Sequence, residues 1–206
     1  TEIGAIGHQL SYQQQLSSNW QFVAGMSRRT SDLQGFSSDA ELASARQGVS
    51  TSNPLLTRQR RYRDYQSTDT TVRAEFSGDS QLLGFSHHLL IGADAYDYAL
   101  YTYLGRYRGP KGSYALDILN PVYGVAVPGT VNPLYANDES QQAAGIYLQD
   151  VIDIAPNWNL LLGLRFDQYQ QKIIEQVKGT RSDASDKVLS PRAGLSLLRL
   201  ARARAL

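Results

Sequence analysis

The sequence has no cysteine among its 206 residues, and its formal net charge is only +1. The absence of cysteine excludes a disulfide framework and a thiolate metal site. A nearly neutral chain has no bulk electrostatic attraction to nucleic acid, so nucleic acid is not an expected partner. No apolar run approaches the roughly 20 residues that a membrane-spanning helix needs. This absence argues against a helical membrane protein but not against a barrel, because barrel strands are short and half polar.

Common enzyme motifs are also missing. The sequence contains no G-x-S-x-G, no glycine-rich phosphate loop and no H-E-x-x-H. His87 and His88 are adjacent, so on a strand they face opposite ways and cannot share a metal ion, and His8 is isolated. We therefore predict that the chain is not an enzyme and has no metal site or cofactor of its own.

The most informative stretch is residues 144–170, which predicts two strands joined by a very short turn at residues 155–157. In the second strand, apolar side chains share one face, and mostly polar or small residues share the other. Aromatic residues end the apolar face, with Trp158 at one end and Phe166 and Tyr169 at the other. An apolar band with aromatic ends is typical of the wall of an outer-membrane barrel.

Similar alternation predicts five further strands, at about residues 8–16, 20–31, 57–77, 85–104 and 187–198. Short gaps at residues 17–19, 78–84 and 155–157 alternate with predicted long loops at residues 32–54, 105–139 and 173–186. This alternation of gap lengths indicates short periplasmic turns and long extracellular loops, whereas a soluble sandwich would not keep that order. In the third strand, the upper part at residues 58–64 is polar on both faces, so we expect it to stand above the membrane in water.

The predicted fold is therefore all-β, an antiparallel transmembrane barrel of which this chain supplies a wall section of about seven strands. Seven strands are too few to close a barrel, and they leave two bare edges. The chain starts at Thr1 in sequence that already alternates, and no signal peptide is visible, so we expect it to be a fragment.

Several segments resemble the mid-barrel of TonB-dependent siderophore receptors. GIYLQDVIDIAPNWNLLLGLRFDQY and LSPRAGLSLL carry the resemblance, and four other segments agree with it in order and spacing: HQLSYQQQLSSNWQFVAGMSRR, LLTRQRRYRDYQSTDTTVRAEFSG, HHLLIGADAYDY and LDILNPVYG. The resemblance extends to about Leu198 and defines a predicted partial barrel domain at residues 1–198. It implies a 22-stranded barrel in the outer membrane of a Gram-negative bacterium, closed by an N-terminal plug domain.

The function that this resemblance implies is active import of a ferric siderophore, with energy from the TonB complex. The iron would be held by its chelator, so the resemblance implies no protein cofactor. Neither a plug nor a TonB box is visible in the sequence, so both are expected in a parent protein, with outer-membrane lipid and lipopolysaccharide as its surroundings. Three alternatives stay open: a passive porin-like channel, a soluble all-β binding module and a non-functional gene remnant.

The last residues depart from the family pattern. The chain ends LLRLARARAL, and alternating alanine and arginine is typical of a shifted reading frame in GC-rich DNA. Our hypothesis is that residues 199–206 form an atypical tail produced by a frameshift or a truncation. The alternative is a variable turn.

Tyrosines are the main candidates for ligand binding, because eight of the thirteen lie between Tyr96 and Tyr135. A tyrosine offers a flat apolar ring and a hydroxyl, which suit an iron chelate. Tyr96 and Tyr98 have the parity of the barrel interior, whereas Tyr101 and Tyr103 lie higher on the strand with the parity of the lipid side. The alternative for these four residues is an aromatic girdle at the lipid interface.

Arginines are the second group of candidates. Arg61 and Arg63 have inward parity and could bind an anionic ligand or lipopolysaccharide phosphates, and the alternative is a solvated upper strand with cross-strand pairs. Charged residues with interior parity lower in the barrel are expected to line the lumen and contact the plug. These residues are Arg73, Glu75, Arg165, Asp167 and Arg192.

Overall fold

The computed structural model of the chain describes residues 1–126 and 129–197, which form strands and loops without any helix. The strands are β1 Glu2–Gln15, β2 Trp20–Ala40, β3 Leu55–Leu82, β4 Phe85–Tyr107, β5 Ala115–Asp117, β6 Asn132–Ala155, β7 Trp158–Glu175 and β8 Thr180–Leu197. The all-β prediction is confirmed. Within these described ranges, no helix is long and apolar enough to cross a membrane. The tail predicted at residues 199–206 lies outside the described residues.

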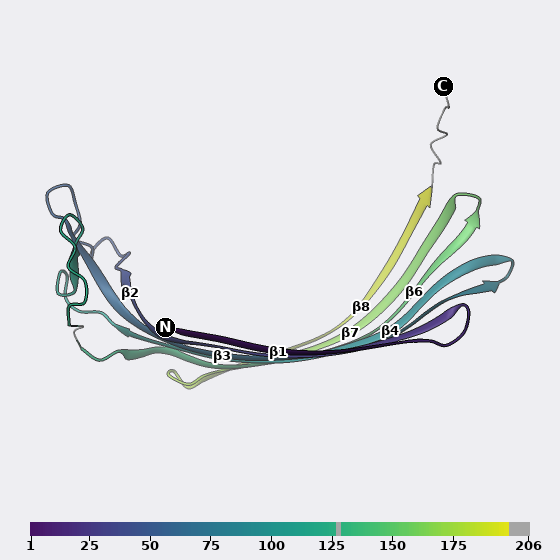
Figure 1. The fold of residues 1–206 in the computed structure, drawn as a ribbon, viewed down its shortest axis with the longest axis horizontal. Coiled ribbons are helices and arrows are strands. Elements are labelled where there is room, and N and C mark those ends of the chain that lie inside the picture. Colours follow the sequence, from purple (N-terminus) through teal and green to yellow (C-terminus); the bar gives the residue numbers. More distant parts are fainter. Residues whose placement is uncertain (127–128, 198–206) are drawn as a thin grey trace, which may run out of the picture.

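Seven long strands form a single antiparallel sheet in the order β1-β2-β3-β4-β6-β7-β8 (Figure 1). Each long strand pairs with the next long strand along the chain, and the short β5 pairs with the beginning of β3. β1 and β8 are the two edges of this curved sheet. The prediction of a barrel-wall section of about seven strands is thus confirmed, with β5 as an addition.

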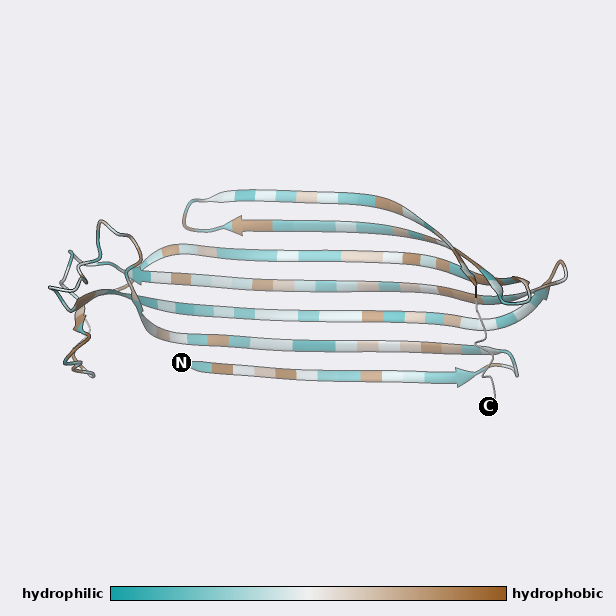
Figure 2. Cartoon of the chain, turned by 90° about the horizontal axis from the view of Figure 1, so that it is seen from above, coloured by the Kyte–Doolittle hydropathy of each residue, from teal (hydrophilic) through white to brown (hydrophobic). Residues whose placement is uncertain are grey.

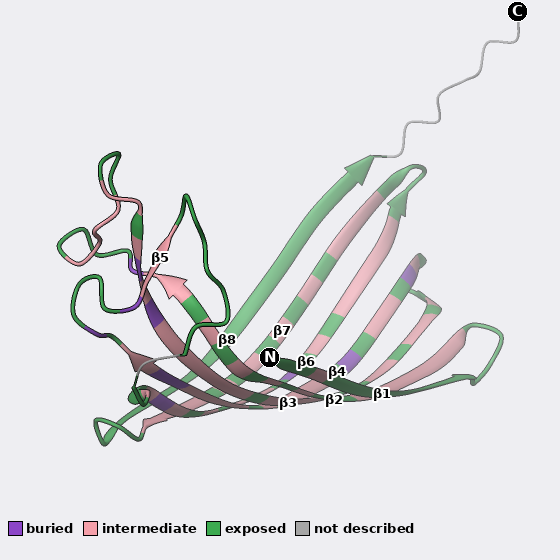
Figure 3. Ribbon diagram, turned by 60° about the vertical axis from the view of Figure 1, so that its left-hand side comes forward, coloured by how far each residue is buried: buried purple, intermediate pink, exposed green. Residues whose placement is uncertain are grey.

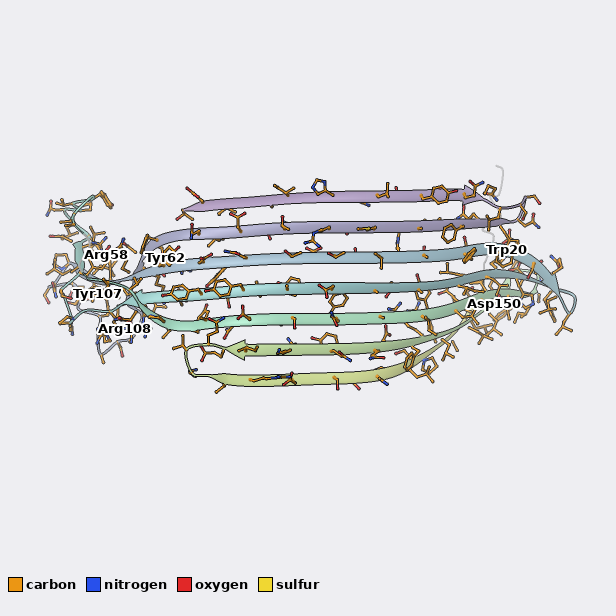
Figure 4. All side chains as sticks on the ribbon, turned by 90° about the horizontal axis from the view of Figure 1, so that it is seen from below. Trp20, Arg58, Tyr62, Tyr107, Arg108 and Asp150 are labelled. Atoms are coloured by element: carbon orange, nitrogen blue, oxygen red, sulfur yellow. The ribbon has the colours of Figure 1, made fainter. Side chains whose placement is uncertain are left out.

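The sheet has two different ends, which we name by their connections. The short-turn end carries the connections at residues 16–19, 83–84 and 156–157, whereas the long-loop end carries residues 41–54 and 108–131. At the short-turn end, Leu83 and Asn157 adopt positive φ angles of 54° and 67°. Figure 4 shows Trp20 and Asp150 at the short-turn end, and Arg58, Tyr62, Tyr107 and Arg108 at the other.

The strands extend much further toward the long-loop end than the sequence predicted. β2 continues to Ala40, β6 already begins at Asn132, and a turn at residues 176–179 is all that separates β7 from β8. The loops predicted at 32–54, 105–139 and 173–186 were therefore too long, and the third is a tight turn. The reason is that apolar and polar residues no longer alternate in these strand ends, so backbone hydrogen bonding continues where the periodic pattern of hydropathy has stopped.

The two faces of the sheet differ in chemistry, because side chains alternate along every strand (Figure 2). We call one face the banded face, because the part of it nearer the short-turn end is apolar and solvent-exposed. Ile146, for example, is 63% exposed. The register aligns the residues of this band across the strands: Phe22, Ala24, Met26, Val72, Ala74, Phe76, Ile91, Ala93, Ile146, Leu148, Leu164, Phe166 and Leu189. The opposite face is the polar face.

The apolar band ends abruptly. One register step beyond Met26 and Val72, the banded face presents a polar row that crosses the sheet: Arg28, Thr70, Asp97, Gln142 and Gln170. Exposed apolar surface of this extent is rare on a soluble monomer, whereas a barrel wall presents it to lipid. Buried residues are few, and several lie where β5 and the long loops meet β3 (Figure 3).

Candidate functional site

A network of charged side chains lies on the polar face, at the level of the apolar band. Its centre is Arg165 on β7, whose guanidinium donates two hydrogen bonds of 2.8 Å to the carboxylate of Asp94 on β4. The Nε of Arg165 also donates to Asp167, at 2.8 Å. The guanidinium carbon lies 5.1 Å from the ring centroid of Tyr147 on β6. One arginine is thus held by two carboxylates and an aromatic ring.

Tyr147 extends this network to β3. Its hydroxyl donates a hydrogen bond of 2.6 Å to Glu75, reaching over Gly92 on the intervening β4. A Cβ atom at Gly92 would collide with the ring of Tyr147, and one at Gly145 would collide with Arg165 and Asp167. The two glycines therefore provide the space through which large side chains cross a neighbouring strand.

Three of the five residues predicted to line the lumen take part in this network, namely Glu75, Arg165 and Asp167. Their polar-face partners Asp94 and Tyr147 were not among the predicted residues, although the same parity identifies their face. Arg73 lies beside Gly25, and Arg192 lies beside Gly163. Among the described residues, no carboxylate lies within 4.0 Å of Arg73 or Arg192.

Nearer the long-loop end, the polar face carries a cluster of arginines. Arg61 and Arg63 each lie 3.1 Å from the same carboxylate oxygen of Asp39, so both predicted arginines face inward as expected. Arg106 is the register partner of Arg61 and has no carboxylate within ion-pair distance in the described part of the chain. Two guanidiniums therefore share one carboxylate and a third has none, which leaves an excess of positive charge on this part of the polar face.

Tyrosines adjoin the arginine cluster on the same face. The hydroxyls of Tyr65 and Tyr135 lie 3.0 Å apart and share a hydrogen bond. Further down, the hydroxyl of Tyr96 donates to the amide oxygen of Gln141 at 3.2 Å, and Tyr98 follows on the same face. Parity alone would have added Tyr65 to the candidates, whereas Tyr135 lies in a segment that was predicted to be a loop.

Tyr101 and Tyr103 lie on the banded face, opposite to Tyr96 and Tyr98. Their register partners on β3 are Gln66 and Asp64. The parity assigned to all four tyrosines agrees with the structure. A binding role inside the barrel stays a prediction for Tyr96 and Tyr98, and the other two tyrosines are not positioned for it.

A buried carboxylate fastens residues 41–54 to the sheet. Glu41 is only 3% exposed, and its carboxylate lies 2.7 Å from Arg108 and 3.2 Å from Arg46. Burial acts to raise the pKa of Glu41, but the N–H of Ala43 and the two guanidiniums outweigh it and hold the pKa below its usual value. The loop is therefore stabilised by an ionised glutamate.

The structure has no clusters suited to metal binding in its described ranges, where no group of three or more His, Asp or Glu side chains could hold an ion. The histidines near the short-turn end instead lie beside carboxylates, and His88 has a second one, that of Asp153, at 3.4 Å. His87 lies 2.7 Å from Asp150, and His88 lies 2.7 Å from Asp79.

Comparison with known proteins shows the same fold and family. Residues 2–200 match the family model described as TonB dependent receptor-like, beta-barrel. The chain is 26% identical over 196 residues to the metal-pseudopaline receptor CntO of Pseudomonas aeruginosa, which covers 91% of this chain and 26% of that protein. It is 33% identical over 128 residues to the ferrioxamine B receptor of Salmonella typhimurium, covering 58% of the chain and 17% of the receptor.

Solved structures share the architecture. The siderophore receptor PiuA of Acinetobacter baumannii superposes with a TM-score of 0.75 at 14% identity, covering 95% of this chain and 30% of PiuA. The unliganded ferric citrate transporter FecA gives a TM-score of 0.71 at 15% identity, covering 96% of this chain and 25% of FecA. The chain spans about a quarter of the length of the first curated relatives that it matches. It belongs to the family of TonB-dependent receptor β-barrels.

Proposed function

We propose that the chain forms part of the wall of an outer-membrane receptor that captures a chelated metal ion and imports it with energy from the TonB complex. In such a barrel, the banded face meets lipid, the polar face lines the interior and the long loops lie outside the cell. The relatives are named as receptors for metal-pseudopaline and ferrioxamine B, so a siderophore or similar metal chelate is the proposed cargo. The metal enters with its chelator, and the receptor itself needs no cofactor.

The observation that carries this proposal is the arginine cluster on the outer part of the polar face. Arg61 and Arg63 share the carboxylate of Asp39, and Arg106, the register partner of Arg61, has none, so their remaining N–H groups can bind the anionic oxygens of a chelate. The rings of Tyr65 and Tyr135 adjoin them and suit the apolar parts of such a ligand. Tyr96 and Tyr98 lie deeper on the same face and would contact a ligand after its capture.

The inner part of the polar face is proposed to contact a plug domain. The side chains around Arg165 are already hydrogen-bonded to one another within the wall, so they offer few unpaired groups to a partner. Arg73 and Arg192 instead lie beside Gly25 and Gly163, and their guanidiniums could donate hydrogen bonds to acceptors on a plug domain. We expect plug contacts mainly at these two arginines.

Uptake of radioactive iron tests the function. Cells that express the complete gene are supplied with hydroxamate, catecholate or carboxylate chelates of iron, with and without an active TonB complex. We expect TonB-dependent uptake of at least one chelate, and about a tenfold or larger loss of apparent affinity when both Arg61 and Arg63 are changed to alanine. Arg60→Ala, on the opposite face of the same strand, is the matched control. Uptake that persists without TonB would instead indicate a passive channel.

A further inference from the structure

We propose that the banded face of β2, β3 and β4, above the apolar band, binds the sugar chains of lipopolysaccharide in the surrounding membrane. This inference depends on the membrane orientation proposed above but not on the cargo. The surface consists of Phe36, Tyr62, Tyr101 and Tyr103, which we call the aromatic shelf. Parity predicted lipid-side positions for Tyr101 and Tyr103. However, the strand register places them beside polar residues and well above the apolar band, which an aromatic girdle at the lipid interface does not explain.

Three of the four rings of the shelf, those of Phe36, Tyr62 and Tyr103, form a connected series. Phe36 and Tyr62 have centroids 4.7 Å apart, and Tyr62 meets Tyr103 edge-on at 6.1 Å. The guanidinium of Arg60 covers one side of the Phe36 ring at 3.9 Å, yet Phe36 remains 49% exposed. Exposed rings supported by other rings are rigid, and a rigid aromatic surface binds the apolar faces of pyranose rings with little loss of side-chain entropy.

Planar polar groups border these rings. Asp64 is the register partner of both Gln34 and Tyr103, and its carboxylate accepts long hydrogen bonds from Gln34 at 3.5 Å and Gln66 at 3.3 Å. Carboxylates and amides offer the paired acceptors and donors that neighbouring sugar hydroxyls need. Rings flanked by such groups favour a carbohydrate over an acyl chain as the occupant.

The height of the shelf above the apolar band supports the same occupant. Val72 is the last apolar residue of the band on β3, and Tyr62 lies ten residues beyond it. Ten residues span roughly 33 Å along the strand, which at the usual strand tilt of a barrel places Tyr62 about 25 Å above the hydrocarbon. Tyr101 lies six residues beyond Ala95, or about 15 Å above the hydrocarbon by the same conversion. Polar rows separate the shelf from the band, so neither acyl chains nor lipid phosphates reach it.

The shelf continues the face that lipid covers lower down. A molecule that contacts it must therefore stand beside the barrel, and lipopolysaccharide places its sugars at that height on every side. Charge agrees with this choice over a phosphate ligand, because Arg60 is occupied by the Phe36 ring and the charges in register with Tyr103 and Tyr101 are the carboxylates of Asp64 and Asp138. A second receptor copy is the competing occupant, and the experiment separates the two.

The test uses the product of the complete gene, purified in detergent and stripped of lipopolysaccharide. The probe is core oligosaccharide released from lipid A by mild acid, and its binding is measured by titration calorimetry. We expect Tyr62→Ala to weaken binding about tenfold, because one stacked ring is lost, and Tyr62→Phe to bind nearly as well as the unchanged protein. Tyr65→Ala, on the polar face of the same strand, should leave oligosaccharide binding unchanged.

Heat-modifiable migration on gels verifies that each variant is folded. Equal oligosaccharide binding by Tyr62→Ala and the unchanged protein would overturn the proposal. It would also be overturned if the unchanged protein formed a dimer that Tyr62→Ala dissociates and bound no detectable oligosaccharide. Chelate uptake is measured in parallel, and Tyr62→Ala should leave it unchanged. Absence of TonB-dependent uptake by the unchanged protein, together with oligosaccharide binding that Tyr62→Ala weakens, would count against the proposed function and not against the shelf.

Discussion

The part of β3 near the short-turn end and the part near the long loops differ in how apolar and polar residues are arranged. Near the short-turn end, Val72, Ala74 and Phe76 alternate with polar residues, because one face meets lipid and the other meets the barrel interior. Toward the long loops, polar residues lie on both faces and apolar residues no longer alternate with them, yet the pairing with β2 continues without a break to Arg58. Backbone pairing thus holds the sheet over its whole length, whereas the alternation of hydropathy records only the part that crosses the membrane.

The largest expected effect comes from placing a charge on the lipid-facing side. Ile91→Arg should destabilise the folded receptor by about 2–4 kcal/mol, because the guanidinium would be buried in hydrocarbon. Ala99→Arg has the same parity on the same strand but lies beyond the band, so we expect a cost of about 0–1 kcal/mol. The free energy of unfolding is measured by urea titration in lipid vesicles. Equal costs at the two positions would refute the proposed membrane boundary.

Removing the central arginine of the wall network should have the next largest effect. Arg165→Met leaves the carboxylates of Asp94 and Asp167 facing each other without a cation. Their side chains are 39% and 34% exposed, so we expect roughly 2 kcal/mol, between the costs for exposed and buried pairs. Arg192→Met, at an arginine without a carboxylate partner, is the control and should cost below about 0.5 kcal/mol. The same urea titration applies.

The glycine beneath Tyr147 offers a smaller and more selective test. Gly92→Ala should cost roughly 1 kcal/mol, because the new methyl group displaces the Tyr147 ring. In a Tyr147→Ala background, this cost should disappear, which a double-mutant cycle measures as a coupling energy. Gly163→Ala, where a Cβ would meet its neighbours at 3.5 Å or more, should be tolerated. Additive costs at Gly92 and Tyr147 would contradict the packing described for them.

The smallest effect on global stability is expected at Glu41, because it fastens a loop outside the membrane. The pKa of Glu41 is lower in the folded loop than in the unfolded chain, so its contribution is complete above the unfolded value and is lost as pH falls through the folded value. Glu41→Gln should speed hydrogen exchange at the Ala43 amide by about tenfold or more at neutral pH, with little change in global unfolding.

A fall in pH should reproduce this loosening in the unchanged protein and have no further effect in the Glu41→Gln variant. Asp117→Asn, at the end of β5, is a control that leaves the Glu41 pairs intact. Exchange at Ala43 that is independent of pH in the unchanged protein would show that the ionised glutamate does not hold the loop.

Sequence alone could assign faces but not neighbours. Parity correctly placed Arg61 and Arg63 on one face and Tyr101 on the other, because a strand leaves no freedom in that choice. It could not show that Arg165 reaches Asp94, since these residues lie on strands that β6 separates and the contact depends on the register of three strands. It also missed Tyr135 and the extension of β2, because polar residues on both faces carry no periodic signal.

The side chains that cross Gly92 and Gly145 have a mechanical consequence. Tyr147 connects β6 to β3 across β4, and Arg165 connects β7 to β4 across β6. Both links therefore span the pairing between β4 and β6. If β4 slid along β6 by one register step and carried β3 with it, both links would break together. A force applied to the polar face is consequently distributed over the strands from β3 to β7. This part of the sheet should therefore keep its strand register under load.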